Sequence, residues 1–525
     1  MADQPATGTP KLGVLLAMAM FVFVIDTSLM NVSISAVVRD LHTTASGVQA
    51  AIAIEALVSA AFILIGSKLG DLFGRKRAYV VGMIFYASGA IAMIFAQGLA
   101  AIIVFWAVIG GLGAALYLPA MQSLIHGNFD GAMRAKVFAM IGAAGAIAAA
   151  VGPLIGGLLT TLLSWRVGFL IEALIIAGVL LGSGLIRDVP YTGDRAVDVV
   201  GSILSVLGMS LLVLGVLAWQ EGGESVAILL IAGTVFSLAL VRWLVRRHRD
   251  GKPTLFDPEL FSHPLFKFGI IQSVNQQIAL GGLLIALPIY LQLELGYNAL
   301  QAGLSLAPLS LSMFFTALLA GKRAGRRRPS SLVRVGFLLL FVGVLAMVPI
   351  VPHADTSLPL VIPLMLCGVG MGLLVSQINN YTLAPISEER VSEAAGVNSA
   401  AGSFGLSFGL AFAGAIMLAT LSFSFTNLAE SSTVLSPADQ QQVGDALEHN
   451  AEVMSNTQLK RQLAGQPGQT QDEIISINTE ARHRALQVAL LIPILAGLAG
   501  LFTSFRMMRI PEPEPSAAAE GMALG

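Results

Sequence analysis

The stretch LGVLLAMAMFVFVIDTSLMNVSISAVV, residues 12–38, holds one charged side chain among apolar and small residues. A hydrocarbon layer about 30 Å thick is crossed by roughly 20 helical residues, so this stretch is long enough to span a bilayer. Comparable apolar stretches follow almost to the end of the chain, at 47–70, 78–97, 100–124, 135–161, 166–186, 197–219, 225–245, 267–293, 299–321, 331–351, 358–378, 395–422 and 485–508. The sequence therefore predicts an all-α membrane protein with fourteen spans.

The composition agrees with this prediction. Of the 525 residues 55% are apolar and only 12% are charged, and the 55 glycines suit close helix packing in lipid. The first apolar segment has only Lys11 as a basic residue ahead of it and contains Asp26, so we expect it to remain as the first helix instead of being cleaved as a signal. Cys367 is the single cysteine, and it can form no internal disulfide.

The charges predict how the chain sits in the membrane. Short loops on one side carry Arg75, Lys76, Arg77, Arg134, Lys136, Arg187, Arg195, Arg246, Arg247, Arg249, Lys252, Lys322, Arg323, Arg326, Arg327 and Arg328. The opposite short loops offer little beyond Arg39 and Arg166. By the positive-inside rule the first side is cytoplasmic, and an even number of spans places both termini there, in a multi-pass protein of the inner membrane.

Two similar loops suggest an internal repeat: GSKLGDLFGRKRAY follows the 47–70 segment, and AGKRAGRRRPSS follows the 299–321 segment. We expect two six-helix bundles, 12–186 and 267–508, of the kind that holds a substrate between parallel halves, with two inserted helices within 197–246. The polar 423–484 segment is expected to form an extracytoplasmic helical loop, either a solvated connector or a lid over an exit path. Residues 509–525 are expected to be a disordered cytoplasmic tail.

Three carboxyl groups lie inside apolar segments, where each costs roughly 2.5–3.5 kcal/mol on insertion scales. Asp26, Glu55 and Glu172 are therefore candidates for proton and substrate coupling, with a structural hydrogen bond as the alternative. We expect a carboxyl group such as Glu55, which has no charged neighbour within a turn, to be protonated much of the time. Glu172 could instead pair with Arg166.

Polar residues on the expected helices suggest a substrate cavity. Gln272, Asn275 and Gln276 share one helical face, and the residues assigned to the cavity are Met30, Asn31, Gln272, Asn275, Gln276 and Asn398. Hydrogen bonding between helices is the alternative explanation.

Other functions find no support in the sequence. GLSFG at 405–409 matches the nucleophile-elbow motif but lies in an apolar helical stretch. The sequence contains no phosphate-binding GxxxxGK[ST] motif and no paired His or Cys residues that could bind a metal. We expect no enzyme, no catalytic or metal site, no cofactor and no nucleic-acid partner.

The chain resembles the major facilitator superfamily, and within it the fourteen-span drug:proton antiporters, over almost its whole length. The loop at 67–76 matches the superfamily signature apart from Ser67 and Leu72, and the matching residues are Leu69, Gly70, Asp71, Gly74, Arg75 and Lys76. The antiporter signature is matched by Gly152, Pro153, Gly156 and Gly157. The resemblance implies gating by the loop and reshapable packing by the glycines. IDTSLMNVSIS around Asp26 resembles the acidic motif of the fourteen-span group.

The sequence departs from the family at two further positions. The resemblance implies an intramembrane arginine before the glycine pair in VFWAVIGGLGAAL, where this chain has Ala107. Glu172 stands where the resemblance implies an amide.

Taken together, these features predict a secondary transporter, acting as a monomer among membrane lipids, that exchanges protons for amphipathic cationic or neutral organic compounds moved outward by alternating access. Export of an endogenous lipid or metabolite is the first alternative, a non-transporting scaffold or sensor the second, and a membrane-embedded enzyme the third.

Overall fold

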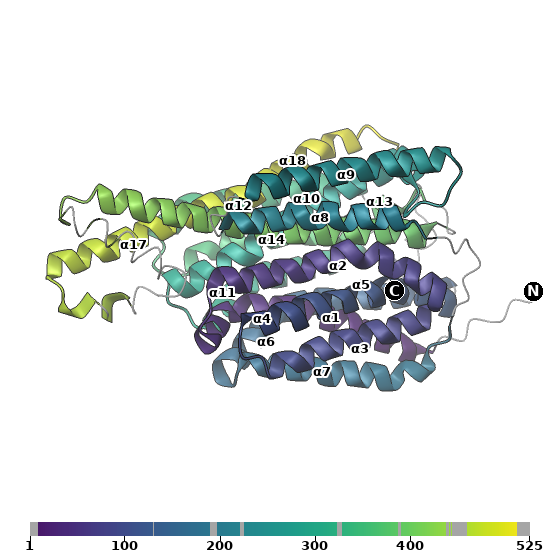
Figure 1. The fold of residues 1–525 in the computed structure, drawn as a ribbon, viewed down its shortest axis with the longest axis horizontal. Coiled ribbons are helices and arrows are strands. Elements are labelled where there is room, and N and C mark those ends of the chain that lie inside the picture. Colours follow the sequence, from purple (N-terminus) through teal and green to yellow (C-terminus); the bar gives the residue numbers. More distant parts are fainter. Residues whose placement is uncertain are drawn as a thin grey trace, which may run out of the picture.

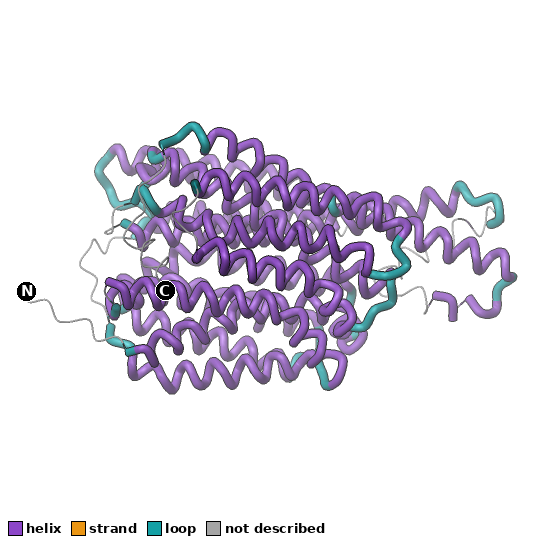
Figure 2. The backbone as a smooth tube through the Cα atoms, turned by 180° about the vertical axis from the view of Figure 1, so that it is seen from behind, coloured by secondary structure: helices purple, strands orange, loops and turns teal. Residues whose placement is uncertain are grey.

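The computed structural model describes residues 9–129, 131–188, 197–220, 225–322, 328–386, 390–436, 440, 443, 459–461 and 463–511. Figure 2 shows helices and loops, and no strand, in this part of the chain. Fourteen helical segments of the described residues are long and apolar enough to cross a membrane. The prediction of an all-α membrane protein with fourteen spans is confirmed.

The first six spans are built from eight helical pieces and a short 3₁₀ turn. They are α1 (Pro10–Leu41), α2 (Ala45–Phe73), α3 (Arg75–Ile94), α4 (Leu99–Ala101) with the π-helix η1 (Ile102–Gly110) and α5 (Gly111–Asn128), α6 (Gly131–Leu162), and α7 (Trp165–Leu181) with η2 (Gly182–Leu185).

The remaining spans follow in chain order. They are α8 (Val199–Gln220), α9 (Val226–Arg249), α10 (Pro264–Ile289) with the π-helix η4 (Tyr290–Glu294), α11 (Ala299–Lys322), α12 (Pro329–Ile350) with η5 (Val351–His353), η6 (Leu358–Leu360) with α13 (Val361–Leu383), α14 (Val391–Glu430), and α17 (Gly468–Ala489) with α18 (Leu491–Met507). Short 3₁₀ turns at η3 (Pro258–Ser262) and η7 (Leu463–Gly465) lie in the connections.

Local sequence explains where several helices begin. Pro10 occupies the first turn of α1, where its missing N–H is not needed. The hydroxyl group of Thr44 accepts a hydrogen bond of 3.1 Å from the backbone N of Gly47 at the start of α2, and Ser164 caps α7 in the same way. The helices are thus delimited by residues that satisfy their first backbone donors.

Two helices are longer than their apolar segments predict. The helix α14 runs to Glu430, beyond the predicted end at 422, and α17 begins at Gly468, before the predicted start at 485. Hydrophobicity marks only the part of a helix that is embedded in lipid. Both helices continue beyond that part, and Figure 1 shows them protruding from one end of the bundle. We call this the hairpin end. Most of the predicted loop between 437 and 458 lies outside the described residues.

We call the protruding parts of α14 and α17 the hairpin. Charged groups fix its base. Glu294 at the end of η4 lies 3.9 Å from Arg482 and 3.5 Å from His483, both on α17. Arg482 also donates a 2.6 Å hydrogen bond to the carbonyl oxygen of Leu293. The return arm of the hairpin is therefore held to η4 by ionic and backbone contacts.

Glycines allow three helices to pack at backbone distance. A Cβ at Gly156 of α6 would lie 2.9 Å from the Cα of Leu29 on α1, and one at Gly157 would lie 2.4 Å from the carbonyl oxygen of Ala299 on α11. On α11, a Cβ at Gly303 would lie 2.2 Å from the carbonyl oxygen of Pro153. Only residues without a side chain fit there, so α6 joins α1 to α11 along its length.

The first of the two central spans packs beside α2 and α14, and the second packs on the first. The helix α8 contacts α9, α2 and α14. The helix α9 keeps large apolar side chains exposed, among them Ile228, Ile231 and Leu238. Figure 1 shows α9 at the margin of the bundle, as expected for a helix that faces lipid.

The close packing of α6 predicts a local effect of side-chain volume. Gly157→Leu should lower the free energy of unfolding by about 1–3 kcal/mol or more, because the new side chain collides with the backbone of α11. Gly142→Leu on the same helix is the matched control, since a Cβ at Gly142 meets no atom within 4 Å. Thermal unfolding of the purified protein in detergent measures both, and an equal loss in the two variants would contradict this account.

Candidate functional site

Asp26, Glu55 and Glu172 lie together inside the first six spans. They come from α1, α2 and α7, and their exposed fractions are 1%, 3% and 2%. Asp26 is close enough to act electrostatically on both glutamates. We call these three residues the carboxyl cluster.

Asp26 is held by two neutral hydrogen-bond donors. The indole Nε1–H of Trp106 lies 2.9 Å from each of the two carboxylate oxygens. The hydroxyl group of Tyr86 donates to Oδ2 at 2.5 Å. Both donors are buried, so the carboxylate is bound by protein groups in place of water.

Helix packing brings these donors to Asp26. A Cβ at Gly89 of α3 would lie 2.7 Å from the carbonyl oxygen of Phe105, so α3 approaches η1 at backbone distance one turn from Tyr86. Trp106 lies in the middle of the π-helix η1, a geometry often found at functional sites. A Cβ at Gly111, just after η1, would lie 3.0 Å from the carbonyl oxygen of Glu55. Small residues around Trp106 thus let α2 and α3 close on the fourth span.

The two glutamates are surrounded differently. Oε1 of Glu55 and both carboxyl oxygens of Glu172 are buried and accept no hydrogen bond from the described residues. Arg166 pairs with Asp40 and donates a 2.7 Å hydrogen bond to the carbonyl oxygen of Ala96, so the predicted pairing of Arg166 with Glu172 is wrong. Arg166 lies near the start of α7, within reach of the end of α1, whereas Glu172 points into the bundle.

No Lys, Arg or His forms an ion pair with the carboxyl cluster among the residues that the structure describes. Ala107, at the place of the arginine that the family resemblance implies, is fully buried. Three carboxylates without cations in a low-dielectric interior repel one another, so some of them must carry protons. The arrangement can therefore store protons within the membrane.

Aromatic rings close around the cluster. Trp106 packs edge-on against Phe169 with ring centroids 6.2 Å apart, and Tyr86 packs against Tyr117 at 5.6 Å. Sequence reasoning missed Trp106 and Tyr86. The available signal was the polar tip of each aromatic residue, since a Trp or Tyr in an apolar helix usually needs a hydrogen-bond partner.

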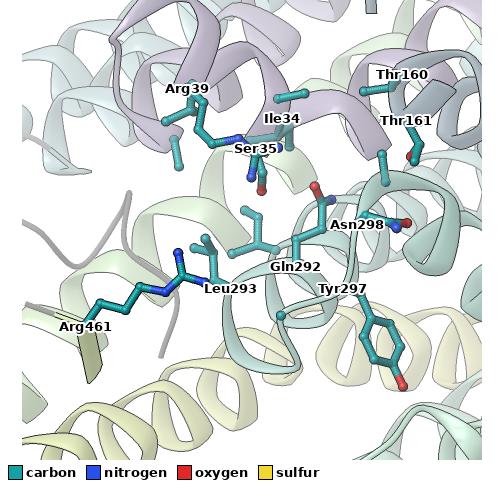
Figure 3. Close-up of a pocket in the computed structure, with 16 residues that line it drawn as sticks. Ile34, Ser35, Arg39, Thr160, Thr161, Gln292, Leu293, Tyr297, Asn298 and Arg461 are labelled. Atoms are coloured by element: carbon teal, nitrogen blue, oxygen red, sulfur yellow. The ribbon is translucent and has the colours of Figure 1, made fainter. Parts of the chain in front are cut away.

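A separate cavity of about 480 Å³ opens between helices at the hairpin end (Figure 3). One wall comes from the ends of α1 and α6, with Arg39 and Thr160, and the other from η4 and the start of α11, with Gln292 and Asn298. Arg461 lies at the side. The described residues that line the cavity include two guanidinium groups and no carboxylate.

None of the residues predicted to line the substrate cavity lines this one. Met30, Gln276 and Asn31 are buried, and the amide nitrogen of Asn31 bonds to the carbonyl oxygen of Thr27 on its own helix at 2.8 Å. Gln272 donates 3.0 Å to the carbonyl oxygen of Gly500, joining α10 to α18. The amide group of Asn275 donates a hydrogen bond to the carbonyl oxygen of Ile271 on its own helix, and that of Asn398 donates one to the side-chain oxygen of Asn379. For Gln272 the structure therefore shows hydrogen bonding between helices, the alternative to a substrate cavity that the sequence left open.

The signature segment 67–76, expected to be a loop, is helical except for Gly74, where α2 ends and α3 begins, and it is tied to residue 188 just after the sixth span. Asp71 pairs with Arg75 at 3.2 Å, and the backbone N of Lys76 donates to Oδ1 of Asp188 at 3.0 Å. Gly74 has φ of +103°, a conformation that disfavours any side chain, and a Cβ there would lie 2.7 Å from Oδ2 of Asp188. The junction at Gly74 therefore connects α2 and α3 to Asp188.

Comparison with known proteins identifies the family of this chain. The sequence profile described as Major Facilitator Superfamily matches residues 16–410. The chain belongs to the major facilitator superfamily. It is therefore a secondary transporter and not an enzyme.

Relatives within the superfamily include efflux proteins. A "Probable actinorhodin transporter" of Streptomyces coelicolor is 28% identical over 436 residues, which cover 80% of this chain and 75% of the relative. The "Multidrug resistance protein Stp" of Mycobacterium tuberculosis is 28% identical over 409 residues, covering 77% of this chain and 75% of that protein. The "Drug efflux pump JefA" of the same species is 27% identical over 422 residues, covering 78% and 80%.

Solved structures of other transporters share the fold. A bacterial homolog of the human lysosomal transporter Spinster, inward-facing and unoccupied, matches with a TM-score of 0.62 at 13% identity, covering 98% of this chain and 100% of that one. The peptide transporter POT matches with a TM-score of 0.58 at 16% identity, covering 97% of each chain. These similarities confirm the fold predicted from the sequence.

The signature loop yields a second prediction. Gly74→Ala should destabilise the folded protein by about 1–3 kcal/mol, because alanine is strained at this backbone angle and its methyl group collides with Asp188. Thermal unfolding in detergent measures the loss. Gly70→Ala is the control, since a Cβ at Gly70 makes only an ordinary 3.5 Å contact with Ala78. Equal stability of the Gly74→Ala variant and the native chain would refute the argument.

Proposed function

We propose that this transporter is a proton-coupled antiporter that moves amphipathic organic compounds, cationic or neutral, out of the cell by alternating access. The observation that carries the proposal is the carboxyl cluster, three buried acids in the first six spans with no basic partner among the described residues. Protons are the ligands that neutralise such a site. A group of acids that must hold protons within the membrane can couple proton movement to a conformational change.

Coupling between proton and cargo is indirect in this proposal. Asp26 bonds to Trp106 and Tyr86, and the cluster lies outside the hairpin-end cavity, so direct competition of cargo for Asp26 is not supported. The helix α1 provides the connection. It carries Asp26 and, two turns further, Ile34 to Arg39 of the cavity wall.

The contact between α1 and α6 continues from the cluster to the cavity. A Cβ at Gly152 would lie 2.5 Å from the Cβ of Ser28, and the hydroxyl groups of Ser33 and Thr160 are hydrogen bonded at 2.7 Å. Close packing of this kind transmits a shift of one helix to the other. A change of charge beside Asp26 can thus move the cavity wall.

The cavity favours certain cargo. Arg39 and Arg461 would repel a cation there, so neutral amphipathic compounds fit it better than strongly cationic ones. Export of an endogenous metabolite is the second candidate function, supported by these guanidinium groups and by the relative named as a probable actinorhodin transporter.

Replacement of Asp26 tests the proposed coupling. Asp26→Asn should reduce proton-driven transport by about 100-fold or more, because the cluster loses its charge while the shape of the side chain is kept. The measurement uses proteoliposomes with an imposed pH gradient, pyranine as the internal proton indicator, and ethidium and a neutral fluorescent dye as trial cargo.

Asp250→Asn, an exposed residue beside Lys252, is the control and should transport at the native rate. Undiminished proton flux in Asp26→Asn proteoliposomes would remove Asp26 from the mechanism. If the rate of cargo transport by the native protein does not depend on the pH gradient, the protein is not a proton antiporter.

A further inference from the structure

The three acids of the carboxyl cluster differ in hydrogen bonding. Asp26 accepts three contacts from Trp106 and Tyr86, and both of its oxygens are used. From the described residues Glu172 accepts none on either oxygen, and Glu55 has a buried Oε1 without a donor. All three are almost completely removed from solvent, so solvation by water does not compensate for the difference.

Hydrogen-bond donors select the charged form of a carboxyl group. Donors aimed at both oxygens stabilise a carboxylate, whereas a buried carboxyl group without donors is more stable when neutral. A neutral carboxylic acid also avoids repulsion from a nearby negative charge. The two environments therefore favour opposite protonation states within one cluster.

Among the residues that the structure describes, no Lys, Arg or His pairs with Asp26. The groups that face it are Tyr86 of α3, Trp106 of η1, Glu55 of α2, Glu172 of α7 and Tyr117 of α5. The α6 residues against α1 at this level are small or apolar, such as Gly152 and Gly156. Neutral donors thus provide all the direct stabilisation that Asp26 receives from the described residues.

We propose that Trp106 and Tyr86 are positioning residues that keep Asp26 as the ionised member of the cluster, and that the exchangeable protons reside on Glu55 and Glu172. This inference rests on the proposed proton coupling and specifies which atoms carry it. In each exchange a glutamic acid O–H bond breaks, its proton leaves toward one face of the membrane, and a proton from the other face re-forms the bond. The Asp26 carboxylate stays unchanged throughout.

The π-helix η1 carries Trp106 at its middle. Trp106 directs its indole N–H at Asp26 while Ala107, the next residue, is buried among neighbouring helices. A neutral donor leaves the negative charge of Asp26 uncancelled. That charge then acts on Glu55 and Glu172, which a cation at the same place would shield.

Infrared spectroscopy of the purified protein in lipid tests the assignment, because a protonated carboxyl group has a carbonyl stretching band that a carboxylate lacks. At neutral pH, Glu55→Gln and Glu172→Gln should each remove such a band, and Asp26→Asn should remove none. Trp106→Phe should create an additional band. That band should disappear in the Trp106→Phe, Asp26→Asn double variant.

The titration gives a quantitative expectation. In Trp106→Phe the Asp26 band should appear at a pH about one to two units higher than in the native protein, from the usual strength of a hydrogen bond to a charged group. Trp165→Phe is the matched control, because the indole of Trp165 donates to Asp40 instead, at 3.1 Å. Tyr86→Phe should act in the same direction as Trp106→Phe, with Tyr79→Phe as its control, since the Tyr79 hydroxyl group forms no hydrogen bond with the part of the chain that the structure describes.

Two results would overturn the inference: loss of a protonated band in Asp26→Asn at neutral pH, or spectra of Trp106→Phe and Tyr86→Phe in which the Asp26 band is unchanged. Should Trp106→Phe fail to fold, Tyr86→Phe decides the question alone. The spectra require no transport. Absence of proton flux with the expected bands therefore counts against the proposed function, and flux with the wrong bands counts against this inference only.

Discussion

The binding of the Asp26 carboxylate by Trp106 and Tyr86 is the interaction on which the functional interpretation depends. A charged group in the interior of a membrane protein requires compensation, and here the described residues offer two neutral donors. Their convergence requires α3 and η1 to pack at backbone distance, which Gly89 permits. The site thus depends on residues without side chains as much as on the donors themselves.

The same principle extends to the cavity at the hairpin end. Gly152 and Gly156 hold α6 against α1, and Gly157 with Gly303 holds α6 against α11. Because these helices touch through backbone atoms, little space remains to absorb a displacement. In the proposed mechanism, a shift of α1 near Asp26 is passed to α6 and on to α11, whose first residues line the cavity.

The ionic base of the hairpin adjoins this cavity. Glu294 ends η4, the element that supplies Gln292 and Leu293 to the cavity wall, and it pairs with Arg482 and His483 of α17. The hairpin and the cavity wall are therefore parts of one packed unit. This contact could not be expected from the sequence, in which Glu294 and Arg482 lie far apart.

The sequence alone determined the number of spans, the helical class, the family and the three acids, because each is recorded in local composition or in a short motif. Tertiary structure decided which groups meet. Tyr86 and Trp106 lie 60 and 80 residues from Asp26, and Arg166 pairs with Asp40 at a separation of 126 residues instead of with its neighbour Glu172. Hydrophobic periodicity places a residue on a helix but does not specify the neighbouring helix, since lipid tails are as apolar as the helix surfaces. Glycine contacts and hydrogen bonds determine which helices are neighbours, and these interactions form only when the helices pack together.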